Sequence, residues 1–487
     1  MRELARKQTE AVRFVKQIES LFSTRTNGLS WPNHDVTELN GKSYVRALLR
    51  PSCGNTCTDI ASSMNLDQES LERFVRESPW EYDAVEDYAH QSVPEETHGK
   101  EAVLIVDGMA IPKSGKDSVG ADRQWCGVKG KVDLCQVTVN SVITRPGEEY
   151  NPNQVTFPLS MRLFLPEKWA GEPDAYDSRD ERRAYEERRE KTGVPDVSYE
   201  KKWEMALSQI AMASDQLDFG CVGADIGFGR CKEFRRELRV MDQPYVLEGK
   251  TGETPTIPEE TELEEPGPTP GKGAPRKHRR YPEDVEAHTP EELAETLSDD
   301  DWTEVTWNQG SKGKMTAEFY RRKIRSVTDR TNNYVSDETG WLLLKRPTDN
   351  SEEQEEKEEL KAWICWGVDD ESLDQLVTWS QIRWAIERFH QDSKQHLGAD
   401  EYQGRTWKGF HHHLAAVMLA HHFLAEQRLK LGEDREELPP FESVVQQVVR
   451  EEAIQRLMRN HGLDRETAKE IGVDMLEGFT TWTPPTG

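Results

Sequence analysis

The chain has 487 residues, enough for one catalytic core with one or two appended or inserted pieces. Its 90 Asp and Glu residues against 63 Lys and Arg give a formal net charge of −27, the wrong sign for a surface that attracts polyanions over its whole area. No apolar run approaches the roughly 18 residues that a membrane-spanning helix needs, and the seven cysteines are scattered along the chain. These features argue against a membrane span and a disulfide framework, and they predict a soluble protein of a reducing cytoplasm.

The first half of the chain is predicted to contain a helical domain followed by an α/β core. Residues 1–98 are assigned to the helical domain because apolar residues recur there at helical spacing. Residues 99–248 form the first part of the core, where short apolar and β-branched runs indicate strands. The predicted strands lie at 102–107, 132–144, 155–165, 220–225 and 244–250, with helices at 198–214 and 231–240.

The second half is predicted to begin with an insertion. Residues 249–301 are rich in Pro, Gly, Glu and Thr and poor in large apolar residues, a composition typical of a disordered or extended acidic segment. Residues 302–370 are predicted to be a strand-rich insertion. Two long core helices are expected within 371–430, and a helical C-terminal region over 431–487.

Two of the predicted core strands end on a carboxylate, and a later helix carries a third. Asp107 and Asp225 follow apolar runs, and Glu387 lies in the predicted helix after the insertion. Carboxylates so placed can converge on two Mg²⁺ ions about 4 Å apart, which stabilise the attacking and leaving oxygens of a phosphoryl displacement. Magnesium prefers such oxygen ligands. An Asp at the end of a strand is more often only a turn or cap residue, so the surrounding residues must show whether it is a metal ligand.

The surrounding residues resemble the DDE transposases of prokaryotic insertion sequences. The first block is Val103-Leu-Ile-Val-Asp107-Gly-Met-Ala-Ile-Pro-Lys-Ser-Gly-Lys116, followed by Arg123-Gln-Trp-Cys-Gly127. The second is Ala224-Asp225-Ile-Gly-Phe-Gly229, and the third, Arg383-Trp-Ala-Ile-Glu387 with Lys394, has the family's Arg-x3-Glu-x6-Lys spacing. Two positions depart from the family pattern. Gly108 replaces a second Asp, and Ser380 stands where the signature often has Tyr.

The resemblance implies an RNase H-like catalytic core with a mixed sheet, a helical N-terminal domain that recognises the inverted-repeat ends of the element, and an insertion between Asp225 and Glu387. It implies Asp107, Asp225 and Glu387 as the catalytic residues and metal ligands, with two Mg²⁺ ions that Mn²⁺ can replace. The implied reaction is metal-dependent cleavage at the ends of the element and strand transfer into target DNA. A homodimer is the implied active form.

Basic residues close to these carboxylates are candidate DNA contacts. Lys113, Lys116 and Arg123 follow Asp107 with Trp125 interleaved, a pattern suited to phosphate contact and base stacking, although a solvated loop would look the same. Arg383 and Lys394 lie four residues before and seven after Glu387, on one helix face, where a plain surface ion pair is the alternative. The histidines at 411–413 and 421–422 lie in an apolar helix and are interpreted as core or DNA-facing residues rather than a metal site.

Two competing functions remain open from the sequence. One is a DNA-binding protein that descends from a transposase and has lost the chemistry, and the other is a plain metal-dependent nuclease on the same fold. The charge of −27 suggests a salt-loving source, because in about 1 M salt the Debye length falls to about 3 Å and a diffuse acidic surface barely repels DNA. Phosphate-loop, zinc-protease and serine-hydrolase motifs are absent from the sequence.

Overall fold

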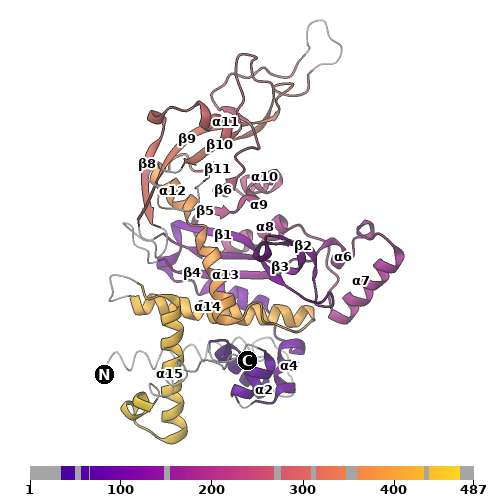
Figure 1. Cartoon of the computed structure of the whole chain (residues 1–487), viewed down its shortest axis with the longest axis vertical. Helices are drawn as coiled ribbons and strands as arrows, with labels where there is room; N and C mark the ends of the chain where they lie inside the picture. Colours follow the sequence, from indigo (N-terminus) through magenta and orange to yellow (C-terminus); the bar gives the residue numbers. More distant parts are fainter. Residues whose placement is uncertain are drawn as a thin grey trace, which may run out of the picture.

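A mixed eleven-stranded sheet forms the centre of the computed structural model, which describes residues 34–49, 56–64, 66–146, 154–267, 276–308, 314–346, 359–432 and 438–471 (Figure 1). The order is β2-β3-β1-β5-β6-β11-β10-β9-β7, with β4 paired to β3 and β8 to β9. The pairs β1–β5 and β5–β6 are parallel, and the other pairs are antiparallel. The strands are β1 (Gly99–Pro112), β2 (Asp122–Cys126), β3 (Lys131–Thr144), β4 (Thr156–Leu163), β5 (Phe219–Ala224), β6 (Tyr245–Gly249), β7 (Thr256–Pro258), β8 (Thr303–Asn308), β9 (Lys314–Asp329), β10 (Tyr334–Arg346) and β11 (Lys361–Trp366).

Helices cover both faces of the parallel centre of this sheet. One face of β1 packs through Val103 and Ile105 into the core that holds α12 and α13, and the other packs through Leu104 and Val106 against α8 and α10. Burial on both faces explains why these strands read as continuous apolar runs. The longer helices are α2 (His34–Leu48), α3 (Cys57–Met64), α4 (Gln68–Glu77), α5 (Asp83–Gln91), α7 (Arg179–Thr192), α8 (Lys202–Ser214), α10 (Lys232–Val240), α12 (Leu373–Gln381), α13 (Trp384–Leu397), α14 (Trp407–Gly432) and α15 (Phe441–His461). The short ones are α6 (Glu167–Ala170), α9 (Ile226–Gly229), α11 (Pro290–Thr296), η1 (Glu95–Thr97), η2 (Gly127–Lys129), η3 (Pro173–Ala175) and η4 (Asp299–Asp301).

The long helix α14 joins the sheet to the N-terminal helices, which lie on its far side (Figure 1). Its histidines make this contact. The Tyr44 hydroxyl donates to Nδ1 of His413 over 2.8 Å, and His412 stacks on Trp80 with ring centroids 3.8 Å apart. Histidines 411–413, 421 and 422 are all buried, as expected for core residues.

The expectation of disorder over 249–301 is wrong for most of that segment. Residues 249–267 and 276–301 contain β7 and α11, and Ile257 and Tyr281 form a small core with Val327 and Val335 of the later strands. Residues 268–275 lie outside the described part of the chain. The segment is poor in apolar residues, but β9 and β10 supply its packing partners, which no composition window can detect.

Most predicted strands and helices of the core are confirmed, with two differences near the candidate site. β1 does not stop at Asp107 but continues to Pro112, because beyond the end of its parallel pairing with β5 it remains paired with β3. The expected helix from 373 to 397 is two helices, α12 and α13, which meet around Arg383 without a glycine or proline there. The strand-rich segment 302–370 extends the core sheet, since β11 pairs with β6. Among the described residues, no helix has the length and apolar character to cross a bilayer.

Candidate active site

Asp107 and Asp225 lie side by side at the carboxyl ends of parallel pairing. The β1–β5 register ends at Val106 opposite Ala224, so the two aspartates are the next residues along each strand. The alternation of side chains in a strand then directs both carboxylates to the face that carries α12 and α13. The sequence expectation that the two aspartates come together is met by this register.

Local hydrogen bonds fix both aspartates. Asp225 is the N-cap of α9, and its Oδ1 accepts the backbone N–H groups of Gly227 over 3.0 Å and Phe228 over 3.2 Å. Oδ1 of Asp107 accepts the N–H of Gly108 over 2.6 Å. A β-carbon on Gly108 would meet its nearest neighbours at 3.8 Å, so packing does not require glycine where the resembling family has a second Asp.

Glu387 reaches the same face from α13, which is tied to β1 and β3. Lys394 Nζ donates to the Ala110 carbonyl of β1 over 3.0 Å, and the His390 Nε2 contacts the Asn140 amide of β3 at 2.9 Å. Asn140 is the residue opposite Asp107 in the β1–β3 pair. In this structure Lys394 therefore anchors the helix that carries Glu387 through one of its three ammonium donors.

Arg383 is the cation at the centre of the acidic group. Its Nη1 lies 2.6 Å from Oε1 of Glu387, and its Nε lies 3.4 Å from Oε2 of Glu248. Burial works against the charge, yet the carboxylates of Glu387, Glu248, Asp107 and Asp225 together hold the pKa of Arg383 above its usual value. Ser380, where the resembling family often has Tyr, is buried and donates to the Val377 carbonyl of its own helix over 2.8 Å.

The environment of Asp107 disfavours the ionised form of its carboxyl group. Burial and the nearby charge of Asp225 raise the pKa of Asp107 to about 7, against the opposing influence of Arg383 and of the Gly108 hydrogen bond. A carboxyl with such a pKa is destabilised when it is ionised, and a bound cation would offset that cost.

The donor chemistry of these residues fits a hard divalent cation. All three predicted ligands are carboxylates, and they share one face of the core. Within the described part of the chain, however, no three His, Cys, Asp or Glu side chains stand in metal-binding geometry. In this structure Glu387 is paired with Arg383, and it must leave that ion pair before it can join the aspartates.

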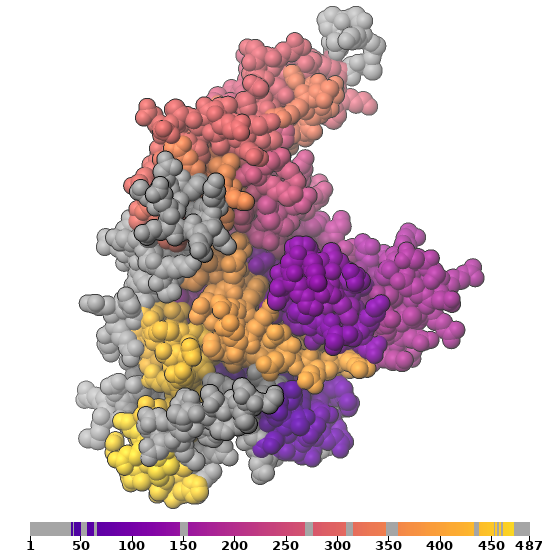
Figure 2. Space-filling view, viewed as in Figure 1, coloured from indigo at the N-terminus to yellow at the C-terminus, as the bar shows by residue number. Residues whose placement is uncertain are grey.

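The other predicted DNA contacts differ in how far they are exposed to solvent. Lys113 is half-buried, and its Nζ donates to the Tyr402 carbonyl over 3.0 Å at the wall of a polar cavity of about 460 Å³. Lys116 and Arg123 are exposed, and Trp125 is 61% exposed on the β2–β3 hairpin, whose strands belong to the violet part of the molecule in Figure 2. Trp125 pairs across the hairpin with Val132, which is 50% exposed, so this face of the hairpin is apolar and open.

Sequence reasoning missed Glu248, the second partner of Arg383. The signal was present, because Tyr245-Val-Leu-Glu248 is an apolar run that ends on a carboxylate, as are the runs before Asp107 and Asp225. The resemblance drew attention to three acids, and the fourth became visible only when β6 was paired beside β5.

The chain belongs to the DDE superfamily endonucleases, whose family model matches residues 33–314. The matched region includes Asp107 and Asp225 and ends before Glu387.

Proteins that are similar to this chain include a curated transposase and a solved transposase structure. The probable transposase for insertion sequence element IS701 of Microchaete diplosiphon is 27% identical over 129 residues, which are 26% of this chain and 32% of that protein. The match thus spans about a third of the curated relative's length. A solved piggyBac transposase synaptic complex with hairpin DNA superposes on 98% of this chain and 84% of its own, with a TM-score of 0.43 and 8% sequence identity.

Proposed function

We propose that the protein is a transposase that cleaves DNA at the ends of an insertion sequence and transfers the freed 3′ ends to target DNA. The observation that carries the proposal is that Asp107 and Asp225 follow the last pair of the β1–β5 register, with Glu387 near enough to raise the pKa of Asp107, within a chain of the DDE endonuclease family. The parallel order β1-β5-β6, with β3 and β4 continuing antiparallel beside β1, supports an RNase H-like core. The strands from 302 to 370 are then an insertion that extends the sheet of that core.

The proposed site would hold two Mg²⁺ ions, or Mn²⁺, on Asp107, Asp225 and Glu387. Bound ions of this kind polarise the scissile phosphate and activate the attacking oxygen. The chain's own residues would place the three carboxylates, with Asp225 fixed by its cap on α9 and Glu387 by the attachment of α13 to β1. Lys113, Lys116, Arg123, Arg383 and Lys394 are the proposed phosphate contacts. We further propose that the protein acts in the cytoplasm as a homodimer on the element ends.

Strand transfer tests this function against its competitors. Purified protein is incubated with Mg²⁺, a duplex that carries the terminal inverted repeats found beside its gene, and a supercoiled target. We expect both cleaved ends and joined products. Cleavage without joining would instead favour a plain nuclease, and binding without either reaction would favour a DNA-binding descendant.

The exposed hairpin face is proposed to stack on DNA bases at a distance from the cut. Trp125 pairs with Val132 and Asp107 with Asn140, which lie 140 − 132 = 8 residues apart on β3, about 27 Å at about 3.4 Å per residue. That length equals about eight base pairs of duplex. Arg123 lies two residues before Trp125, on the same face of β2.

Replacing Trp125 with alanine is expected to weaken binding to end DNA that contains an unpaired stretch. One stacked base contributes about 1–3 kcal/mol, so the dissociation constant should rise roughly 5- to 150-fold. Fluorescence anisotropy at fixed salt measures this dissociation constant. Trp125→Phe should keep most of the affinity, and Val240→Ala, at a position 74% exposed on α10, should have no effect. Equal affinities for Trp125→Ala and the wild type would contradict base stacking.

The net charge predicts a dependence on salt. If the −27 reflects a salt-loving source, the fold should be lost on dialysis to about 10 mM salt, where the Debye length is about 30 Å and carboxylate repulsion is unscreened. Circular dichroism against KCl concentration measures the midpoint. A protein that stays folded at low salt would show that the acidic surface has another origin.

A further inference from the structure

A row of three carboxylates crosses the parallel centre of the sheet. The β1–β5 register ends at Val106 opposite Ala224, and the β5–β6 register ends at Ala224 opposite Leu247. The next residues along the three strands are Asp107, Asp225 and Glu248. Since parallel strands in register direct side chains at one level to the same face, all three acids lie on the face that carries α12 and α13.

Glu248 and Glu387 share a single arginine. Arg383 contacts Glu387 through Nη1 at 2.6 Å and Glu248 through Nε at 3.4 Å. The two acids differ in environment, because the side chain of Glu387 is 53% exposed and that of Glu248 is 18% exposed. One partner thus borders solvent, while the other lies within the sheet.

The backbone around Glu248 is held in place from both sides. Gly229 of α9 approaches so closely that a β-carbon there would lie 2.0 Å from the Glu248 carbonyl oxygen. On the other side, Glu248 pairs with Trp363 of β11. The Gly-x-Gly sequence after Asp225 therefore brings α9 onto β6 and fixes the level of Glu248 beside Asp225. The backbone of Glu248 is therefore fixed at this level, from which its side chain contacts Arg383.

We infer that Glu248 is a positioning residue of the site, which holds Arg383 when Glu387 turns to a divalent cation. The inference rests on the proposed function. Glu387 cannot stay paired with Arg383 and also bind a cation with the aspartates, because the guanidinium and the cation repel each other. With Glu248 beside it, Arg383 has a second carboxylate at contact distance and remains paired. Without Glu248, Arg383 would stay on Glu387 and compete with the metal.

A double-mutant cycle on metal affinity tests this role without DNA or catalysis. Calorimetric titration with Mn²⁺ gives the dissociation constant for the full-length wild type, Glu248→Gln, Arg383→Gln and the double variant. We expect Glu248→Gln to weaken Mn²⁺ binding by about tenfold when Arg383 is present, and by less than about twofold when Arg383 is glutamine. The effect disappears in the second case because Glu248 then has no arginine to hold.

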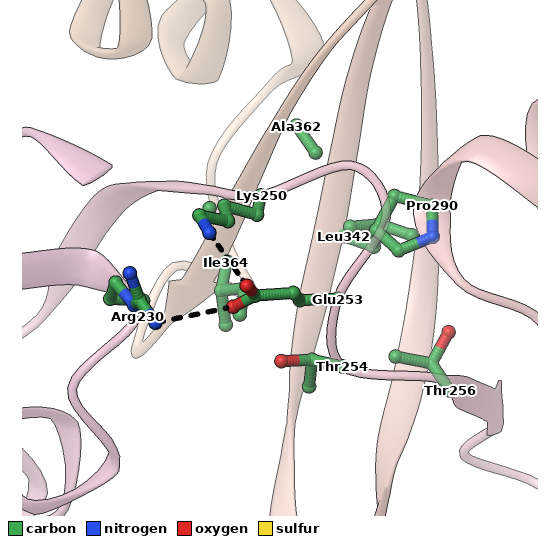
Figure 3. Close-up of a pocket in the computed structure, with 10 residues that line it drawn as sticks. Arg230, Lys250, Glu253, Thr254, Thr256, Pro290, Leu342, Ala362 and Ile364 are labelled. Atoms are coloured by element: carbon green, nitrogen blue, oxygen red, sulfur yellow. Dashed lines mark hydrogen bonds and ion pairs between the residues drawn. The ribbon is translucent and has the colours of Figure 1, made fainter. Parts of the chain in front are cut away.

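The control variant removes a carboxylate charge from a nearby residue, Glu253. Glu253 lies five residues after Glu248, and its ion-pair partners are Lys250 at 2.6 Å and Arg230 at 3.8 Å (Figure 3). Glu253→Gln should leave Mn²⁺ affinity within about twofold, which separates the role of Glu248 from a general loss of negative charge. If Arg383→Gln does not fold, Arg383→Lys replaces it, since a single ammonium lacks the fork that reaches both carboxylates.

Two outcomes would overturn the inference. An equal loss of affinity for Glu248→Gln in both backgrounds would make Glu248 a metal ligand in its own right, and an unchanged affinity in the Arg383 background would remove its role. Failure of the proposed function is distinguishable from these. In that case the wild type itself would show no Mn²⁺ binding that Asp107→Asn abolishes.

Discussion

Changing Asp107 or Asp225 to asparagine, or Glu387 to glutamine, is expected to slow DNA cleavage at least about a hundredfold each, with DNA binding near the wild-type level. Amides keep the shape of these side chains but are poor magnesium ligands. Asparagine can also keep the cap of Asp225 on α9, since a side-chain carbonyl accepts the same N–H groups. The losses should not add in a double variant, because the carboxylates act as one unit.

A stability measurement separates loss of charge from loss of fold. Because burial and Asp225 raise the pKa of Asp107 to about 7, the metal-free site is strained at pH 8, where Asp107 is largely ionised. Asp107→Asn should therefore raise the unfolding temperature of the metal-free protein by a few degrees while it abolishes cleavage. Calorimetry in chelator at pH 8 measures the first effect, and a gel assay in Mg²⁺ the second.

Acidic residues outside the site serve as controls, and the structure decides which are suitable. Asp117 is exposed and pairs only at the surface with Arg405 over 3.2 Å, so Asp117→Asn should remain active. Asp122 accepts the Tyr185 hydroxyl over 2.8 Å, a hydrogen bond that asparagine can keep. Asp392 is buried beside Arg388 at 3.2 Å, so its amide tests folding as well as chemistry. An active Glu387→Gln enzyme would show that the third ligand is another residue.

Acidification from pH 7 to about pH 5 is expected to unfold the protein, because four buried histidines must stay neutral in the fold. Burial lowers the pKa of His390, His411 and His421 to about 3 and that of His413 to about 4, from about 6.5 in an unfolded chain. The unfolded state therefore binds more protons as pH falls below about 6.5. The stability these histidines support is complete above that pH and is lost progressively towards pH 3 to 4.

The hydrogen bonds of two of these histidines specify the neutral ring. His411 Nδ1 donates to the Trp407 carbonyl over 3.0 Å, and its Nε2 accepts the Leu163 N–H over 3.4 Å. His413 Nε2 donates to the Gly398 carbonyl over 3.0 Å and its Nδ1 accepts from Tyr44. A second proton would remove the acceptor in each ring. His412 is not counted, because burial lowers its pKa to about 4 while hydrogen bonds to the carbonyls of Val75 at 2.7 Å and Trp80 at 2.9 Å oppose that lowering.

The expected loss of stability on acidification is large relative to the total free energy of unfolding of a protein. Each histidine contributes about 1.4 kcal/mol per pH unit within its window, so four contribute about 5 to 6 kcal/mol per unit against a total of about 5 to 15 kcal/mol. Urea midpoints between pH 5 and 8 at fixed salt measure the slope. His421→Phe should reduce it by about one proton, because His421 packs between Phe389 and Phe441. A pH-independent midpoint would refute the assignment.

The sequence by itself determined the apolar runs of the core strands and the two aspartates that follow those runs. Burial on both faces makes such strands continuous apolar runs, and the carboxylates that follow them are local features of the chain. Glu387 and Arg383 could likewise be placed on one helix, since their spacing is a local property. The N-terminal helices, from residue 34 onward, were also readable from periodicity.

Only the tertiary structure decided which acids meet and what holds them. Glu248 lies beside Asp225 because β6 pairs with β5. Arg383 contacts both Glu248 and Glu387 from the junction of α12 and α13, where the helix is interrupted without a local stop signal in the sequence. The order of segment 249–301 depends on apolar partners from β9 and β10, far along the chain. These features depend on contacts between distant residues, and a local pattern carries no information about the partner that a side chain will meet.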